Sequence, residues 1–96
     1  MSAFSREIRS FLVVSQSDSI RAAAERLNIS APALSRQLQM LERSYDTTLL
    51  VRSAGGVALT AEGEALRDEA MRWLAADTAL TKRLHQSRKV TDLRLR

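Results

Sequence analysis

The chain has 96 residues, enough for one domain with a modest core, and 45% of them are hydrophobic. The absence of cysteine excludes disulfides and thiolate metal sites and suits a reducing cytoplasm. The sequence has no apolar run of membrane-spanning length and no signal-peptide pattern, so we expect a soluble, cytoplasmic protein without membrane contact.

The net charge of +4 is unevenly distributed along the chain. The last fifteen residues carry six basic side chains and one acid, so residues 1–81 sum to −1. Residues 1–52 hold seven arginines against five acids, whereas residues 61–81 hold two arginines against five acids. An argument for nucleic-acid binding therefore depends on where the arginines lie and not on the total charge.

Two short helices are expected first. Apolar residues at helical spacing predict a helix over about residues 4–16. A polar break follows, in which Asp18 or Ser19 is the expected N-cap of the next helix. That helix, Ile20–Leu27, has alanines on its buried face, and small side chains there let two helix backbones approach closely.

Residues 28–45, NISAPALSRQLQMLERSY, predict a tight turn and a third helix. Ser30 is the expected N-cap, and Pro32 is tolerated because first-turn amides have no intrahelical partner. Apolar residues at 34, 38, 41 and 45 form the inward stripe. The opposite face then carries Pro32, Arg36, Gln39 and Arg43, with Ser35 on its flank. A short helix, a turn and a second helix over about residues 20–39 form a helix-turn-helix.

The outer face of the third helix has polar groups that can bond to the bases and phosphates of DNA. Arg36 can donate two hydrogen bonds to guanine, at O6 and N7, or bind a phosphate. Ser35 and Gln39 can reach base edges or phosphates, and Ala31 and Pro32 can touch a thymine methyl. The alternative is an ordinary solvated helix face, so the surrounding sequence has to decide.

The runs 49–51 and 57–59 predict two short strands, and the glycines between them supply the positive φ of a hairpin turn. The expected product is a wing; the alternative is an irregular loop. Arg52, at the root of the wing, is expected to bind a phosphate group of DNA. Ser19 and Arg21 can do the same at the start of the second helix. For Arg21 and Arg43 a solvated position is an equal alternative.

A fourth helix is expected to begin after its Thr60 cap and to end at about residue 88. Its expected length is ~25 residues, or ~37 Å. Its apolar stripe has heptad spacing and exceeds what one small domain covers, so a homodimer through this helix is expected. The interface residues assigned are Leu66, Ala70, Trp73, Leu74, Asp77, Leu80 and Leu84. Asp77 either sits at the dyad or faces a basic side chain of the partner; the sequence leaves this open.

Residues 90–96 alternate like a strand that has no partner in this chain. We therefore divide the chain into residues 1–60 as a winged helix-turn-helix and 61–88 as the linker and dimerisation helix. Residues 89–96 are expected to be the start of a further domain or a disordered basic tail.

Several segments, in this order and spacing, carry a family resemblance: SIRAAAERL (19–27), SAPALSRQL (30–38), LE (41–42), LLVR (49–52) and LTAEG (59–63). Over about residues 3–90 the chain resembles the N-terminal DNA-binding domain of LysR-type transcriptional regulators. The resemblance implies a mainly α fold in which three helices and a two-stranded β wing precede a long dimerisation helix.

The same resemblance implies that a dimer binds an interrupted palindrome in double-stranded DNA and regulates transcription. The family's contact positions map onto Ala31, Pro32, Ser35 and Arg36. Full-length members carry a C-terminal domain that senses a small molecule and can form higher oligomers. An effector is therefore expected to act only through that domain. We expect this chain to be a fragment of a longer regulator that lacks that domain; a naturally short protein is the alternative. No cofactor is expected in this fragment.

The chain departs from the family pattern at three places. Tyr45 and Asp46 stand where Leu-Gly usually ends the recognition helix, so a different turn is possible there. Leu50 replaces the usual phenylalanine before the wing. Gly55 or Gly56 lies where many members have an arginine, which leaves minor-groove contact by the wing open.

An enzyme is not expected. His85 is the only histidine and lies in a basic segment, and the neighbouring acids Asp68 and Glu69 point in different directions. No glycine-rich phosphate loop or metal-ligand spacing occurs. The alternative function is a dimerisation or protein-interaction module without specific DNA binding, which would leave the Pro32–Arg43 face unexplained.

Overall fold

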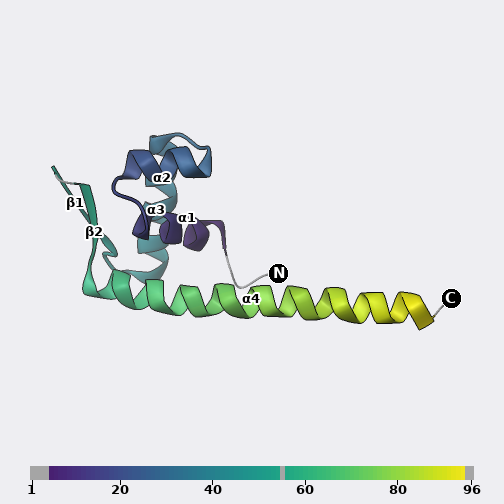
Figure 1. The fold of residues 1–96 in the computed structure, drawn as a ribbon. Coiled ribbons are helices and arrows are strands. Elements are labelled where there is room, and N and C mark those ends of the chain that lie inside the picture. The colour runs from purple at the N-terminus through teal and green to yellow at the C-terminus, as the bar shows by residue number, and fades with distance from the viewer. Residues whose placement is uncertain (1–4, 55, 95–96) are drawn as a thin grey trace.

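The molecule consists of a three-helix head, a two-stranded wing and one long helix that extends beyond both (Figure 1). The computed structural model describes residues 5–54 and 56–94, with side chains through Arg88. The elements in chain order are α1 (Arg6–Ser15), α2 (Ile20–Leu27), α3 (Ala31–Tyr45), β1 (Leu50–Ser53), β2 (Gly56–Leu59) and α4 (Ala61–Arg94). The predicted fold class, a mainly helical winged helix-turn-helix followed by a long helix, is confirmed.

Serines begin all three helices of the head. The Oγ atoms of Ser5, Ser19 and Ser30 accept a hydrogen bond from the backbone N–H three residues later, at 3.2, 3.0 and 3.2 Å. Each hydroxyl satisfies an amide that has no partner within its helix. The prediction for Ser30 is confirmed, and of the two candidates before α2 the cap is Ser19. The first helix begins at Arg6, inside the expected range 4–16, of which residue 4 lies outside the described part.

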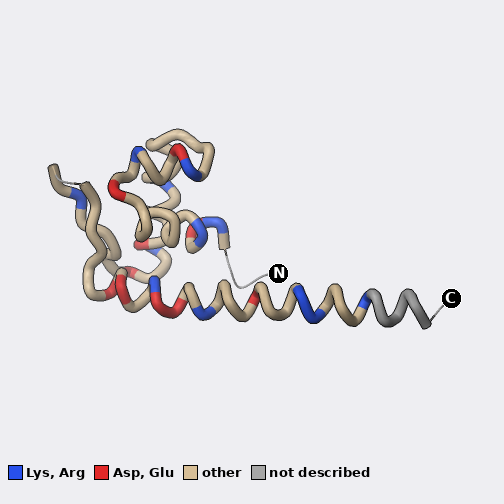
Figure 2. Tube along the Cα trace, in the orientation of Figure 1, with Lys and Arg blue, Asp and Glu red and all other residues tan. Residues whose placement is uncertain are grey.

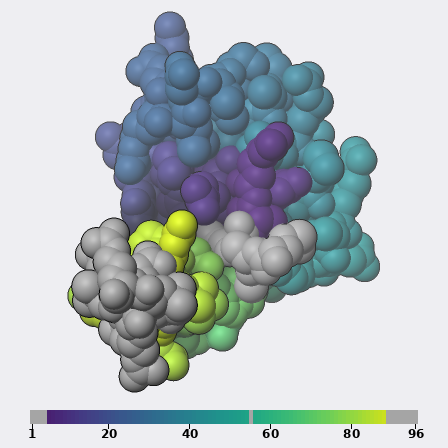
Figure 3. Space-filling model, turned by 90° about the vertical axis from the view of Figure 1, so that its right-hand side faces the viewer, coloured from purple at the N-terminus to yellow at the C-terminus, as the bar shows by residue number. Residues whose placement is uncertain are grey.

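The core of the head forms where α1, α2 and α3 meet. Phe11, Val14, Leu34 and Leu38 are the largest fully buried side chains. Ala23 is also completely buried, and α2 contacts both α1 and α3. The start of α4 packs on α1 and on β2, so the long helix closes the core from below (Figures 1 and 3).

The wing is an antiparallel hairpin in which Leu50 pairs with Leu59 and Ser53 with Gly56. Gly56 has a φ of +126°, which residues with a Cβ rarely adopt. A Cβ at this position would lie 2.5 Å from the carbonyl oxygen of Asp18, so the glycine also lets the wing approach the α1–α2 turn. The predicted hairpin is confirmed; Gly55 lies outside the described residues.

The long helix does not end where the sequence suggested. It continues to Arg94, so the predicted end near residue 88 and the strand or disordered tail from residue 89 are wrong as far as Arg94. Residues 84–94 contain no glycine or proline that would end the helix. An extended strand here would have no second strand for its backbone hydrogen bonds, whereas a helix forms these bonds within itself. Residues 95–96 lie outside the described part.

Among the described residues, no helix combines the length and apolarity needed to cross a membrane.

Helix α3 ends at Asp46, which adopts the left-handed conformation with φ 51° and ψ 46°. The N–H of Asp46 donates to the carbonyl oxygen of Arg43 at 3.1 Å, and the N–H of Thr47 donates to that of Glu42 at 3.0 Å. These two bonds form the turn that glycine normally closes. The turn therefore forms without glycine, but with a Cβ in a left-handed conformation and an acid at the negative end of the helix dipole.

Replacing Asp46 with glycine is expected to raise the free energy of unfolding by about 1 kcal/mol, because it removes both unfavourable terms at some cost in chain entropy. The thermal midpoint would rise by about 4–8 °C. Thermal unfolding of Asp46→Gly beside Asp46→Asn, which removes the charge alone, measures both contributions. A lower midpoint for the glycine variant would mean that the Asp46 side chain stabilises the turn.

Candidate nucleic-acid interface

The recognition helix α3 turns its leucines inward and its arginines outward. Leu34, Leu38 and Leu41 are buried, whereas Arg36 and Gln39 are exposed. Pro32 and Arg43 are exposed on the same side. The predicted orientation is confirmed for the three leucines, but the predicted burial of Tyr45 on the same stripe is wrong, because this last residue of the helix is 46% exposed. Contact of the outer side chains with DNA stays a prediction.

Neighbouring elements hold α3 at its start and near its middle. Asn28 ends α2 in the left-handed conformation, and Ile29 packs against the core at the turn between the helices. Near the middle of α3, the buried hydroxyl of Ser10 on α1 donates a hydrogen bond to Oε1 of Gln37. This bond links the inner flank of α3 to α1, so rotation of the outer face would break a buried polar contact.

The wing contacts α3 through Arg52, which pairs with Val57 one pair from the turn, so its predicted place at the root of the wing is wrong. Its Nη2 donates a hydrogen bond to Oγ of Ser35 at 2.9 Å. The structure thus brings two predicted contact residues, one on β1 and one on α3, next to each other. Because an arginine has five donors and Ser35 keeps its own O–H donor, the pair can still donate to a phosphate or a base.

The remaining predicted contact residues, Ala31, Ser19 and Arg21, differ in how accessible they are to DNA. Ala31 is half-buried and packs against the core, so only part of its methyl group faces outward. Ser19 uses its oxygen to cap α2, while Arg21, two residues later, is exposed. The close approach of Gly56 to Asp18 places the N-terminus of α2 beside the wing.

Two residues on α3 escaped the sequence analysis. Met40 is 55% exposed and lies one turn after Arg36, where it adds an apolar group to the outer face. Glu42 points toward the wing, and its Oε2 accepts hydrogen bonds from the N–H groups of Leu49 at 2.7 Å and Leu50 at 3.3 Å. Glu42 therefore fixes the strand entrance against the recognition helix. The position of Met40 on the helical wheel was a usable signal, whereas no local pattern indicated the partners of Glu42.

Replacing Glu42 with glutamine is expected to lower the free energy of unfolding by about 1 kcal/mol, because a charge-assisted hydrogen bond exceeds a neutral one by about that amount. Hydrogen exchange at the Leu49 and Leu50 amides should become faster than in wild type. Glu25→Gln, an exposed acid on α2, is the matched control and should leave both values unchanged. Unchanged exchange at both amides would contradict the assigned bonds.

The apolar stripe of α4 divides into two parts. Leu66 and Trp73 are half-buried against the core of the same chain, and Ala70 is completely buried in it. The assignment of Ala70 to a dimer interface is therefore wrong, because α1 and the wing already cover that face of the helix. Beyond Trp73, Leu74 is 37% exposed, Leu80 51% and Leu84 58%. Asp77 is half-buried.

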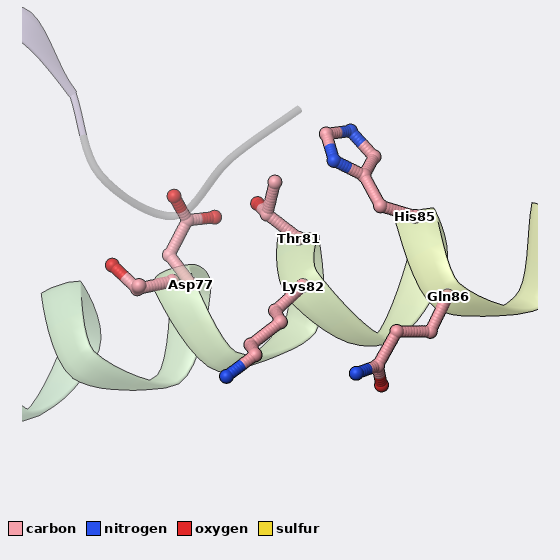
Figure 4. Close-up of a pocket in the computed structure, with 6 residues that line it drawn as sticks. Asp77, Thr81, Lys82, His85 and Gln86 are labelled. Atoms are coloured by element: carbon pink, nitrogen blue, oxygen red, sulfur yellow. The ribbon is translucent and has the colours of Figure 1, made fainter.

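A group of polar residues lies on the far part of α4. Asp77, Thr81 and His85 project from one side of the helix and Lys82 and Gln86 from the other, around a shallow depression (Figure 4). Within residues 5–54 and 56–94, no group of three or more acids, histidines or cysteines could hold a metal ion.

Comparisons with known proteins agree on one family. A family profile described as "Bacterial regulatory helix-turn-helix protein, lysR family" matches residues 5–64. The regulator TfdT of Cupriavidus pinatubonensis is 41% identical over 70 residues, which covers 73% of this chain and 31% of TfdT. ClcR of Pseudomonas putida is 42% identical over 69 residues, covering 72% of this chain and 24% of ClcR. The chain thus spans about a quarter to a third of the length of these curated relatives.

Solved structures are similar over most of the chain. The DNA-binding domain of CbnR in complex with DNA matches with a TM-score of 0.81 at 35% identity, covering 85% of this chain and 94% of that one. The DNA-binding domain of BenM on the benA site 1 DNA matches with a TM-score of 0.80 at 32% identity, covering 84% and 94%.

Proposed function

The chain belongs to the LysR family of bacterial helix-turn-helix regulators and is the DNA-binding part of a transcriptional regulator, and from this premise we propose how it binds. Two copies bind one face of double-stranded DNA and each inserts α3 into the major groove. The two half-sites form an interrupted palindrome. The observation that carries this proposal is the outward, solvent-exposed position of Arg36 above a stripe of buried leucines.

The assigned roles follow from the chemistry of each group. Arg36 and Gln39 read base edges, and Pro32 makes apolar contact in the groove. Arg52 and Ser35, already hydrogen-bonded to each other, hold the phosphate backbone beside the wing. The N-terminus of α2, with Ser19 and Arg21, is a second phosphate site because the first amides of a helix have no partner within it and carry the positive end of its dipole.

Selection of bound sequences from random duplex DNA tests the proposal. We expect enrichment of two inverted half-sites whose centres lie one or more helical turns apart, at about 10–10.5 base pairs per turn. Affinity for the selected DNA should fall steeply with salt, because phosphate contacts release counterions. Absence of any enriched sequence at low ionic strength would overturn specific binding.

The exposed half of the α4 stripe supports dimerisation through this helix. Leu80→Asp is expected to give monomers in sedimentation velocity, because the new carboxylate would be buried between two helices. The fold should persist, since Leu80 is half exposed in the single chain. Thr78→Asp places the same charge on the opposite side of α4 and is the control. Dimers that survive Leu80→Asp would move the interface elsewhere.

A further inference from the structure

Met40 is a large apolar side chain that α3 keeps on its outer face. Leu34, Leu38 and Leu41 are buried in the head, whereas Met40 is 55% exposed. Met40 follows Arg36 by four residues, so the two side chains project from neighbouring turns on the same side of the helix. The apolar surface of Met40 is therefore available to whatever the outer face of α3 binds.

The outer face of α3 has two different flanks. Successive residues of a helix are turned by about 100°, so Gln39 and Met40 point to opposite sides of Arg36. Ser35 lies on the side of Gln39 and accepts a hydrogen bond from Nη2 of Arg52 at 2.9 Å, so the wing lies beside this polar flank. Met40 therefore lies on the other flank of the outer face, which is turned away from the wing.

No acid of α3 lies on its outer face. The single acid of this helix is Glu42, and its Oε2 accepts hydrogen bonds from the N–H groups of Leu49 and Leu50 at the entrance to the wing. Acidic side chains gather instead where α4 begins (Figure 2), at residues 62, 64, 68 and 69. Because a carboxylate repels phosphates, the outer face of α3 can approach DNA without a charge of its own that opposes it.

Thymine is the base that an apolar side chain can recognise in the major groove. It presents a 5-methyl group there, which the other three bases lack. Contact between Met40 and this methyl group would remove apolar surface of both from water. Methionine suits such a contact because its unbranched, flexible thioether chain adapts to an irregular surface.

We propose that Met40 selects a thymine in each half-site by contact with its 5-methyl group. This inference rests on the insertion of α3 into the major groove proposed above. Four residues advance a helix by about 6 Å, which corresponds to about two base pairs at about 3.4 Å per pair. The thymine is therefore expected about two base pairs from the base that Arg36 reads, and selection with Arg36→Ala identifies that base as the one whose preference is lost.

Replacing this thymine with uracil in the operator tests the contact, because uracil lacks only the methyl group and keeps the O4 acceptor and the base pairing. Wild type should bind about fourfold more weakly with uracil in one half-site and about 15-fold more weakly with uracil in both, the factor expected for one buried methyl group per half-site. Met40→Ala should bind the thymine and uracil operators equally. Met71→Ala removes a methionine of α4 that is 43% exposed and, as the matched control, should respond like wild type.

Three results would overturn the role of Met40. They are a selected half-site without thymine at this distance, equal binding of thymine and uracil by wild type, and a uracil effect that persists in Met40→Ala. The last would assign the methyl group to another side chain, such as Pro32. In each case the preference that depends on Arg36 remains, whereas failure of the proposed function itself would appear as no enriched sequence at all. The thermal midpoint of Met40→Ala should match wild type because Met40 is exposed, so a change in affinity reports the contact and not unfolding.

Discussion

Replacing Arg36 with alanine is expected to weaken operator binding by about 30-fold to 10⁴-fold, with the dimer and the thermal midpoint unchanged. A bidentate contact to guanine discriminates by about 1–3 kcal/mol, and a dimer loses one contact in each half-site. Stability should not change because Arg36 is exposed on the outer face of α3. Fluorescence anisotropy with labelled operator measures the affinity, and sedimentation and thermal unfolding measure the rest.

Arg36→Lys separates two roles of this side chain. A lysine keeps the charge but lacks the planar fork, so it retains much of a phosphate contact and little of a guanine contact. If Arg36 reads a base, the lysine variant should also lose preference for the selected half-site over a mutated one. A fall in stability or dimerisation of Arg36→Ala, or an affinity within twofold of wild type, would contradict the assigned orientation of α3.

Replacing Gly63 with alanine is expected to lower the free energy of unfolding by about 3 kcal/mol, the upper part of the usual range for overpacking. A Cβ on Gly63 would lie 2.1 Å from the carbonyl oxygen of Leu49, which also accepts the N–H of Thr60. Backbone atoms cannot rotate away from such a clash, so α4 would have to move off the wing entrance. At about 4–8 °C per kcal/mol, the thermal midpoint should fall by more than 10 °C.

The sign of this effect is decisive, because alanine in a helix normally gains about 1 kcal/mol over glycine. Replacing an exposed glycine in the middle of a helix with alanine would therefore raise the free energy of unfolding. Glu64→Ala, an exposed substitution at the next position, is the control and should stay within about 0.5 kcal/mol of wild type. A stabilised Gly63→Ala variant would mean that α4 does not approach Leu49 as closely as the structure has it.

Local chemistry explains why much of this fold could be predicted from the sequence. The spacing of Leu34, Leu38 and Leu41 fixes which side of α3 is buried, and so which side carries Arg36. A serine before a helix satisfies amides that the helix itself leaves free, so Ser30 marked its start correctly. The glycines at 55 and 56 predicted the hairpin for a similarly local reason. Each signal operates over a few neighbouring residues, within reach of a single sequence.

Other features depend on which distant segments lie together, and only the tertiary structure decided them. The apolar stripe of α4 is continuous in sequence, yet Ala70 is covered by its own head while Leu80 and Leu84 stay exposed. The bonds from Glu42 to β1 and from Arg52 to Ser35 join positions that no periodicity relates. Periodicity tells which face of a helix must be covered, but the packing of the whole chain determines what covers it, because burial depends on every neighbour in space.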